Sequence, residues 1–332
     1  MVSIRLHPRL FPLASFAFAL LATLALPAGA QTAPARQVPG VYHQAIGDLH
    51  VTALFDGVVP LARAELSGID EAGKQALLSS RHVPESPQGL QTAVNAYLVQ
   101  RGDVLTLVDA GTAQCFGPGL GHVLENLRHA GYSPEQVDQV LITHAHPDHL
   151  CGLLDAQGRE AFPNATVWLA RADADYWLDP ATETRTDTPA MYRPLFKMAR
   201  DAVAPYRAAG RLHLFAQGER LPAGVSGLDS HGHTPGHTSF LFEAGADQQL
   251  LVWGDIVHYH AVQFARPDAS FEADLDRGQA IASRRALMAR TADAGWWLAG
   301  AHLPFPGLGH VRRDDDAFAW VPAEFSPLPG EP

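Results

Sequence analysis

Short runs of apolar and β-branched residues recur along the chain between Gly, Asp and Pro turn signals, and such runs predict β-strands. The runs are His50–Phe55, Ala96–Val99, Val104–Val108, Val140–Thr143, Thr166–Ala170, Leu212–Phe215, Ser239–Glu243 and Leu250–Trp253. Apolar residues at helical spacing predict helices over Gly121–Ala130, Tyr192–Ala209 and Phe271–Asp293. Ser133-Pro134-Glu135-Gln136 has the composition of a capped turn. This alternation predicts an α/β protein.

The domain organisation follows from what separates these elements. A chain of 332 residues is long enough for two domains. No low-complexity linker divides residues 41–332, so we expect one α/β domain over that range. Within it, Asp179–Pro189 is rich in Thr, Asp and Pro and predicts a mobile loop.

Residues 1–30 have the pattern of a secretory signal peptide. A basic start is followed by the apolar run Leu10–Leu26 and by the small residues Ala28-Gly29-Ala30. Proline interrupts this stretch, which is already short for a membrane span. We expect cleavage before Gln31, a flexible leader over residues 31–40, and an exported protein, periplasmic or secreted, with no stable membrane insertion after cleavage.

Composition and charge narrow the class of partner. Apolar residues make up 47% of the chain and charged residues 18%, which is sufficient for a large core. The chain has 24 basic and 35 acidic side chains and a charge of −11, and loss of Arg5 and Arg9 with the signal leaves 22 basic side chains and −13. Basic residues form no cluster, which argues against a nucleic-acid partner. This balance favours a small-molecule or protein substrate.

The chain has 17 histidines and two cysteines. Cys115 and Cys151 could pair in an oxidising compartment. However, two lone cysteines are more often small buried apolar groups, and this is the alternative that we expect. A zinc site built from thiolates needs more cysteines at close spacing. A metal site in this chain would therefore use His and carboxylate side chains.

One segment concentrates such side chains. His144, His146, Asp148 and His149 fall within six residues, directly after the apolar run that ends at Thr143. Imidazole nitrogens and carboxylate oxygens are preferred ligands of zinc. A solvated loop would not require this combination, so the segment predicts a metal site.

The His-x-His-x-Asp-His segment resembles the signature of the metallo-β-lactamase superfamily. Three further segments resemble its remaining signature elements in the same order, and they are Ser230–Thr238, Trp253-Gly254-Asp255 and Gly300-Ala301-His302. The resemblance covers Val41–Val321 and implies the four-layer αβ/βα sandwich of that superfamily.

The resemblance also implies two divalent metal ions, zinc by default, and a set of ligands for them. His144, His146 and His233 would hold one ion, Asp148, His149 and His302 the other, and Asp255 would bridge the two. Such a pair of ions can lower the pKa of a shared water enough to form a nucleophilic hydroxide, and can polarise a substrate oxygen. Asp148 and Asp255 are therefore the predicted catalytic carboxylates of a metallohydrolase.

Other residues are expected around these ligands. Asp109 lies at a strand end where the family often carries an acid near the ligands, with an ordinary turn aspartate as the alternative. His237 is expected to be a structural neighbour rather than a ligand. His258, three residues past Asp255, is expected to line the pocket, where an imidazole would suit a lactone or ester better than a dialkyl aryl phosphate. Aromatic residues that could form the rest of an apolar pocket, or could equally belong to the core, are Phe116, Trp177, Phe196, Phe271 and Phe305.

Longer segments resemble one group within the superfamily, the exported methyl parathion hydrolases and lactonases. They include Val51–Leu54, Ala261–Phe264 and, most distinctively, His302–His310. This implies hydrolysis of small neutral substrates, namely lactones or aryl esters, with phosphotriesters as main or side substrates.

The alternatives are a β-lactamase, a thioesterase of the glyoxalase type and a metal-binding protein without catalysis. The first group does not generally use an aspartate bridge such as Asp255. The second usually adds a basic C-terminal region, whereas this chain has Asp314-Asp315-Asp316 there. The sequence leaves a homodimer open.

Overall fold

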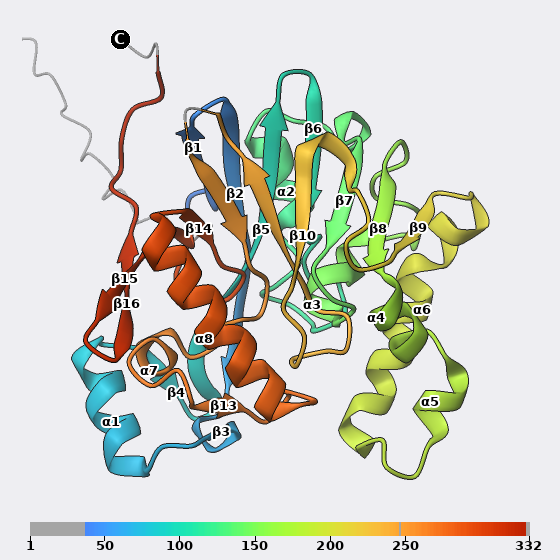
Figure 1. The fold of residues 1–332 in the computed structure, drawn as a ribbon. Helices are drawn as coiled ribbons and strands as arrows, with labels where there is room; N and C mark the ends of the chain where they lie inside the picture. The colour runs from blue at the N-terminus through green and yellow to red at the C-terminus, as the bar shows by residue number, and fades with distance from the viewer. Residues whose placement is uncertain (1–36, 246, 330–332) are drawn as a thin grey trace, which may run out of the picture. The chain divides into compact units, whose positions relative to one another are not determined.

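The computed structural model describes residues 37–245 and 247–329 (Figure 1). The predicted signal peptide and residues 31–36 of the predicted leader lie outside the described residues. Within the described part of the chain, no helix is both long enough and apolar enough to cross a membrane.

The first sheet has the strand order β1-β2-β5-β6-β7-β8-β9, with β4 beside β5. Its strands are β1 (Val41–Ile46), β2 (Leu49–Leu61), β4 (Glu85–Ser86), β5 (Gly89–Arg101), β6 (Val104–Val108), β7 (Gln139–Ile142), β8 (Thr166–Ala170) and β9 (Leu212–Phe215). The strands from β1 to β6 pair antiparallel, whereas β6, β7, β8 and β9 run parallel. The carboxyl ends of β6, β7 and β8 therefore lie at one edge of the sheet.

The second sheet has the order β10-β11-β12-β14-β15-β16. Its strands are β10 (Val225–Asp229), β11 (Thr238–Glu243), β12 (Gln249–Val252), β14 (Trp297–Ala299), β15 (Leu308–Asp314) and β16 (Ala317–Pro322). Only the pair of β12 and β14 is parallel among the strands described for this sheet. A small separate sheet joins β3 (Leu66–Ser67) to β13 (Ser270–Phe271).

Helices flank both sheets, as Figure 1 shows. Those that accompany the first sheet are α2 (Val123–His129), α3 (Pro147–Leu150), α4 (Arg171–Trp177), α5 (Pro180–Thr184) and α6 (Arg193–Ala208). The others are α1 (Glu71–Ser80), α7 (His260–Gln263) and α8 (Arg277–Ala294), of which α8 contacts β15. Short 3-10 turns are η1 (Arg63–Glu65), η2 (Pro134–Gln136), η3 (Cys151–Leu153), η4 (Ala190–Tyr192) and η5 (Pro222–Gly224).

Alternation along the strands sorts side chains between the layers, because successive residues point to opposite faces. On β7, Val140 and Ile142 belong to the core beneath α6, whereas Leu141 belongs to the core between the two sheets. On β12, Leu250 belongs to that same central core, and Leu251 packs in the core with residues of α8. The layers are therefore helix, sheet, sheet and helix, which confirms the predicted four-layer αβ/βα sandwich.

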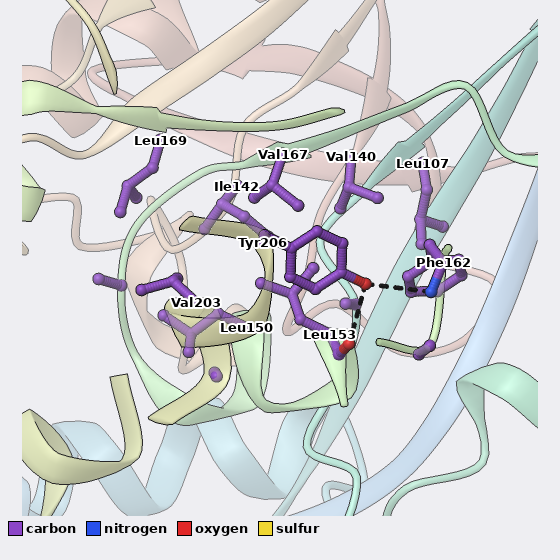
Figure 2. Packing of buried hydrophobic residues seen from close by; sticks show 14 of the residues in the cluster. Leu107, Val140, Ile142, Leu150, Leu153, Phe162, Val167, Leu169, Val203 and Tyr206 are labelled. Carbon is purple, nitrogen blue, oxygen red and sulfur yellow. Dashed lines mark hydrogen bonds between the residues drawn. The ribbon is translucent and has the colours of Figure 1, made fainter. Parts of the chain in front are cut away.

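A buried tyrosine of α6 joins the helical layer to the connection between β7 and β8 (Figure 2). The Tyr206 side chain of α6 is completely buried. Its hydroxyl donates to the carbonyl of Leu153, at 2.9 Å, and accepts the N–H of Phe162, at 3.0 Å. Since a buried hydroxyl is costly unless it is hydrogen-bonded, these contacts fix η3 against α6.

Two predicted elements differ from the structure. The helix expected over Phe271–Asp293 begins only at Arg277, because Asp276 caps it by accepting the N–H of Gln279 at 2.9 Å, and Phe271 lies in β13 instead. The segment Asp179–Pro189, expected to be a loop, contains α5. Asp179 caps that helix by accepting the N–H groups of Ala181 and Thr182. In both cases an aspartate cap sets the start of the helix.

Cys115 and Cys151 form a disulfide, with their Cα atoms 6.3 Å apart. The expectation that they are unpaired is wrong. The bridge joins the loop after β6 to the first residue of η3, so it connects segments that the sequence separates by 36 residues. Only the packing of β6 beside β7 brings these segments together.

We expect the disulfide to stabilise the protein by about 2–4 kcal/mol, because it restricts a long loop in the unfolded chain. Urea unfolding of the wild type should shift to lower concentration when a reductant is added. The double variant Cys115→Ser/Cys151→Ser should unfold at the lower concentration with or without reductant. A wild-type midpoint that does not respond to complete reduction would contradict this expectation.

Candidate metal centre

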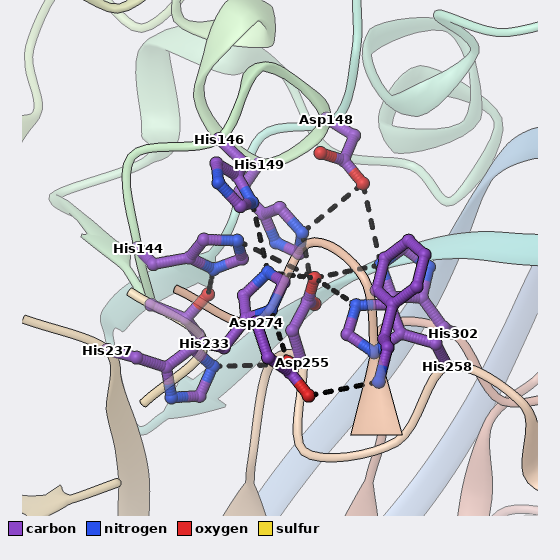
Figure 3. Close-up of polar contacts among 12 residues, drawn as sticks. His144, His146, Asp148, His149, His233, His237, Asp255, His258, Asp274 and His302 are labelled. Carbon is purple, nitrogen blue, oxygen red and sulfur yellow. Dashed lines mark hydrogen bonds and ion pairs between the residues drawn. The ribbon is translucent and has the colours of Figure 1, made fainter. Parts of the chain in front are cut away.

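Four loops bring histidines and aspartates together at one end of the sandwich (Figure 3). The loop after β7 carries His144, His146, Asp148 and His149, and Pro147 begins α3 in the middle of this segment. His233 comes from the connection between β10 and β11, Asp255 follows β12, and His302 follows β14. Because β12 and β14 are parallel, their following loops lie at the same edge.

These side chains form two sets of four that share Asp255. One set is His144, His146, His233 and Asp255, and the other is Asp148, His149, Asp255 and His302. In each set, the potential ligand atoms lie within 4.8 Å of one another. The five histidines and Asp255 are buried, and the Asp148 side chain is 16% exposed. The arrangement therefore provides two neighbouring cation sites with one common carboxylate.

Asp255 is at the centre of the cluster. Its Oδ2 lies 3.5 Å from His144 Nε2, 3.3 Å from His233 Nε2 and 3.1 Å from His302 Nε2. Its Oδ1 lies 3.1 Å from His149 Nε2. Asp148 Oδ2 completes the second set at 3.4 Å from Nε2 of both His149 and His302.

The donor atoms fit divalent cations. The Nε2 atoms of His144, His146 and His149 and the Oδ1 of Asp255 are buried without a hydrogen bond in proper geometry. A buried polar atom without a partner is costly, and several of them pointing at one another are typical of a metal site. The residues predicted as ligands are therefore brought together in a form that can hold two ions.

The protonation states agree with this arrangement. Burial lowers the pKa of His144 and His146 well below the usual value, so both imidazoles are neutral and have a free lone pair. Burial by itself would raise the pKa of Asp255, but the surrounding imidazoles, His149 and His302 above all, outweigh it and lower that pKa. Burial by itself would lower the pKa of His149, His233 and His302, but the nearby carboxylates outweigh it and raise all three, that of His233 to about 9. Divalent ions bound here would displace these protons, so metal binding would be coupled to proton release.

The other ring nitrogen of most of these histidines is held by the scaffold. His149 Nδ1 lies 2.8 Å from Asp109 Oδ2, and His233 Nδ1 lies 3.0 Å from Asp274 Oδ1. His302 Nδ1 lies 2.8 Å from the carbonyl oxygen of Ala93 in β5. Such contacts fix the ring orientation and leave Nε2 available to a metal ion.

Comparison with known proteins identifies the family to which this chain belongs. The protein-family model of the metallo-beta-lactamase superfamily matches residues 89–302, which contain all seven of these side chains. The chain belongs to this superfamily. It is therefore a metal-dependent hydrolase of the metallo-β-lactamase type.

Solved structures agree with the superfamily assignment. The hydrolase AbOPH of the beta lactamase superfamily is 37% identical, with a TM-score of 0.83 over 88% of this chain and 100% of that chain. AidC, a dizinc quorum-quenching lactonase, is 24% identical, with a TM-score of 0.78 over 87% and 99% of the two chains. A probable metal-dependent hydrolase from Staphylococcus aureus is 20% identical, with a TM-score of 0.66 over 85% and 100%. None of the curated protein sequences matches the chain.

In this superfamily member, Asp109 and His237 both position the predicted ligands. Asp109 accepts the N–H of Thr143 at 2.8 Å in addition to its contact with His149. His237 is outside both sets of four. Its Nε2 accepts the backbone N–H of Asp255 at 2.9 Å, and its Nδ1 contacts Ser230 Oγ at 2.8 Å. Burial lowers the pKa of His237 to about 3, as an accepting imidazole requires.

The predicted pocket residues divide into three kinds. Phe196 is completely buried in the core beneath α6, so its assignment to the pocket is corrected to core packing. Trp177 is also in that core, but its ring contacts the His146 ring, with centroids 4.9 Å apart. Phe116 is 42% exposed on the loop after β6. Phe271 lies beside His258, with ring centroids 4.5 Å apart, and Phe305 lines a cavity with His302.

His258, which was expected to line the pocket, directly contacts the residues of the metal centre. Its Nε2 is 2.9 Å from Asp255 Oδ2, and its ring stacks on that of His302, with centroids 5.0 Å apart. Its Nδ1 is buried without a hydrogen-bond partner among the described residues. His258 therefore orients the shared carboxylate.

Sequence analysis missed two buried carboxylates that hold the ligand loops. Asp173 of α4 accepts the N–H of Ala145 at 2.7 Å and that of Gly236 at 2.6 Å, and so joins two ligand loops. Asp274, which contacts His233, also lies 3.4 Å from the buried guanidinium of Arg284. Asp173 could have been found from its place just after β8, the strand that pairs with β7. Asp274 was concealed by the helix predicted over it.

We expect Asp109→Asn to weaken metal binding by about 10- to 100-fold, because an amide cannot accept from both His149 and Thr143. Competition with a chelator measures the affinity. Asp138→Asn is the matched control, since Asp138 accepts the N–H of Leu105 at the opposite end of the same strand. Equal losses in the two variants would show a general effect on the fold and contradict a specific role for Asp109.

Proposed function

We propose that this chain is an exported lactonase and arylesterase that works with two zinc ions, and that phosphotriesters are a second class of substrate. The observation that carries the proposal is the pair of four-residue sets sharing Asp255, one of which contributes His302 to the wall of a cavity. The group of methyl parathion hydrolases and lactonases, which the sequence resembles, combines these activities.

The cavity beside His302 is suitable for a small ester. It has a volume of about 400 Å³, within the usual range for ligand sites. Its apolar walls are Phe55, Val58, Val83, Pro84, Ala93, Pro304 and Phe305. An aryl or alkyl group would be desolvated there while its scissile carbonyl lies toward the histidine and aspartate cluster.

Two zinc ions bound by the two sets would supply a nucleophile from water near neutral pH and would polarise the scissile carbonyl or phosphoryl oxygen. The chain itself fixes the donors before substrate arrives, since Asp109, Asp274 and the carbonyl of Ala93 hold three of the imidazoles. His258 Nε2 holds Asp255 Oδ2 in place. Preorganised groups of this kind do not have to reorient during the reaction.

The relatives support the same class of reaction. AbOPH is named as a hydrolase, and AidC as a dizinc lactonase. Both span nearly the whole of this chain, and the dizinc site of AidC supports zinc as the metal proposed here. A lactone and a phosphotriester both develop negative charge on an oxygen during hydrolysis, so one centre can act on both.

Zinc-loaded protein should turn over lactones and aryl esters with higher kcat/KM than phosphotriesters, thioesters or β-lactams. Asp255→Asn should lose metal and activity by at least about 100-fold, because it removes the shared carboxylate. His258→Leu should weaken metal binding and lower kcat/KM for lactones and phosphotriesters together, because it removes the imidazole that orients Asp255. Preferred turnover of β-lactams or thioesters, or full metal occupancy without any hydrolysis, would contradict the proposal. An unchanged metal affinity in His258→Leu would contradict the role of that residue.

Export is part of the proposal, and the Cys115–Cys151 disulfide supports it, since disulfides persist in oxidising compartments. We expect the full chain expressed in a Gram-negative host to be recovered outside the cytoplasm with Gln31 at its N-terminus. N-terminal sequencing of that material measures this. Cytoplasmic protein that begins at Met1 would contradict it.

A further inference from the structure

The cavity beside His302 has a polar wall formed by Arg81, whose guanidinium is cationic, and by the imidazoles of His82 and His260. No Asp or Glu is among the residues described as lining the cavity. The only other polar side chains that line it are those of Gln91 and His302. The cavity is therefore locally cationic, although the chain as a whole has 35 acidic and 24 basic side chains.

The local backbone fixes Arg81 and His82 at this wall. Helix α1 ends at Ser80, and the N–H groups of His82 and Val83 donate to the carbonyls of Ser79 and Leu78, at 3.1 and 3.2 Å. This is a Schellman cap, which usually has glycine at the position of His82. His82 instead has a left-handed φ of 51°, which is less favourable for a side chain that carries a Cβ. The loop therefore keeps an imidazole at the cavity where glycine would stabilise the helix end better.

Arg81 carries the fixed charge of the wall. Its side chain has no hydrogen bond or ion pair with any other described residue. The nearest acid along the chain, Glu85, is paired with Arg63. Burial and the charge of Arg81 lower the pKa of His260 to about 4, so that imidazole is neutral at pH 7 and can donate or accept a hydrogen bond. The guanidinium is thus left for a group that enters the cavity.

We propose that the preferred substrate is an ester or lactone that carries a carboxylate remote from its scissile bond, and that Arg81 binds this carboxylate. This inference rests on the hydrolase function proposed above. Guanidinium groups bind carboxylates through paired hydrogen bonds, and a neutral His260 can add another. The apolar part of the substrate would lie along Phe55 and Phe305 between the two polar ends of the cavity. A monoanionic substrate would replace the neutral one that the resemblance implies.

The test compares para-nitrophenyl hydrogen glutarate with its neutral methyl ester on the zinc-loaded full chain. Hydrolysis adds water across the aryl ester bond and releases para-nitrophenol with glutarate or its monomethyl ester. The wild type should prefer the acid by about tenfold in kcat/KM, and Arg81→Gln should abolish this preference. Arg207→Gln is the matched control. Arg207 is an exposed arginine in the last turn of α6, so this substitution removes the same charge near another helix end. Added salt should reduce the preference of the wild type.

Equal rates on the acid and its methyl ester in the wild type, or a preference that survives in Arg81→Gln, would overturn the inference while leaving the hydrolase function intact. Failure to cleave either ester would overturn the hydrolase function. In that case, calorimetric binding of glutaramate still decides the inference. Wild type and Arg207→Gln should bind it about tenfold more tightly than Arg81→Gln, and equal affinities in all three proteins would overturn the role of Arg81.

Discussion

The buried carboxylate of Asp255 is the constraint on which the rest of the structure depends. A carboxylate that is 3% exposed is costly unless opposite charge or hydrogen-bond donors surround it. Here Oδ2 lies within 3.5 Å of nitrogens of His144, His233, His258 and His302. The surrounding imidazoles offset part of this charge and lower the pKa of Asp255, and divalent cations held by the two sets would offset it further. The chemistry of the site and the stability of its loops are therefore linked through one side chain.

The fold meets this constraint by drawing each support from a different element. Asp109 follows β6, Asp173 lies in α4, Asp274 precedes α8, and the carbonyl of Ala93 lies in β5. The ligand loops themselves follow strands of both sheets. The two sheets must pack in the correct register before the donors meet, so the central core between them is also what positions the metal centre.

The residues that hold the metal centre and many of the residues that would select a substrate lie on different segments of the chain. The ligand loops follow strand ends and are braced by buried aspartates. Much of the cavity wall outside β2, β5 and His302 is contributed by the cap of α1, by α7 and by the loop after His302. Substitutions in that wall can change the group that enters without disturbing Asp255. Arg81 and His82 occupy such positions.

The sequence by itself determined the alternation of strands and helices and the ligands as chemical types, and its resemblance to the superfamily implied the four layers. Apolar runs between turn signals located the strands, and the spacing of His144, His146, Asp148 and His149 identified a metal-binding segment. Only the tertiary structure decided the Cys115–Cys151 bridge, the supports from Asp173 and Asp274, the burial of Phe196, and the polar cavity wall at Arg81. The physical reason is distance along the chain. Periodicity and motif spacing report contacts between near neighbours, whereas these features join residues that meet only when the two sheets and their helices pack.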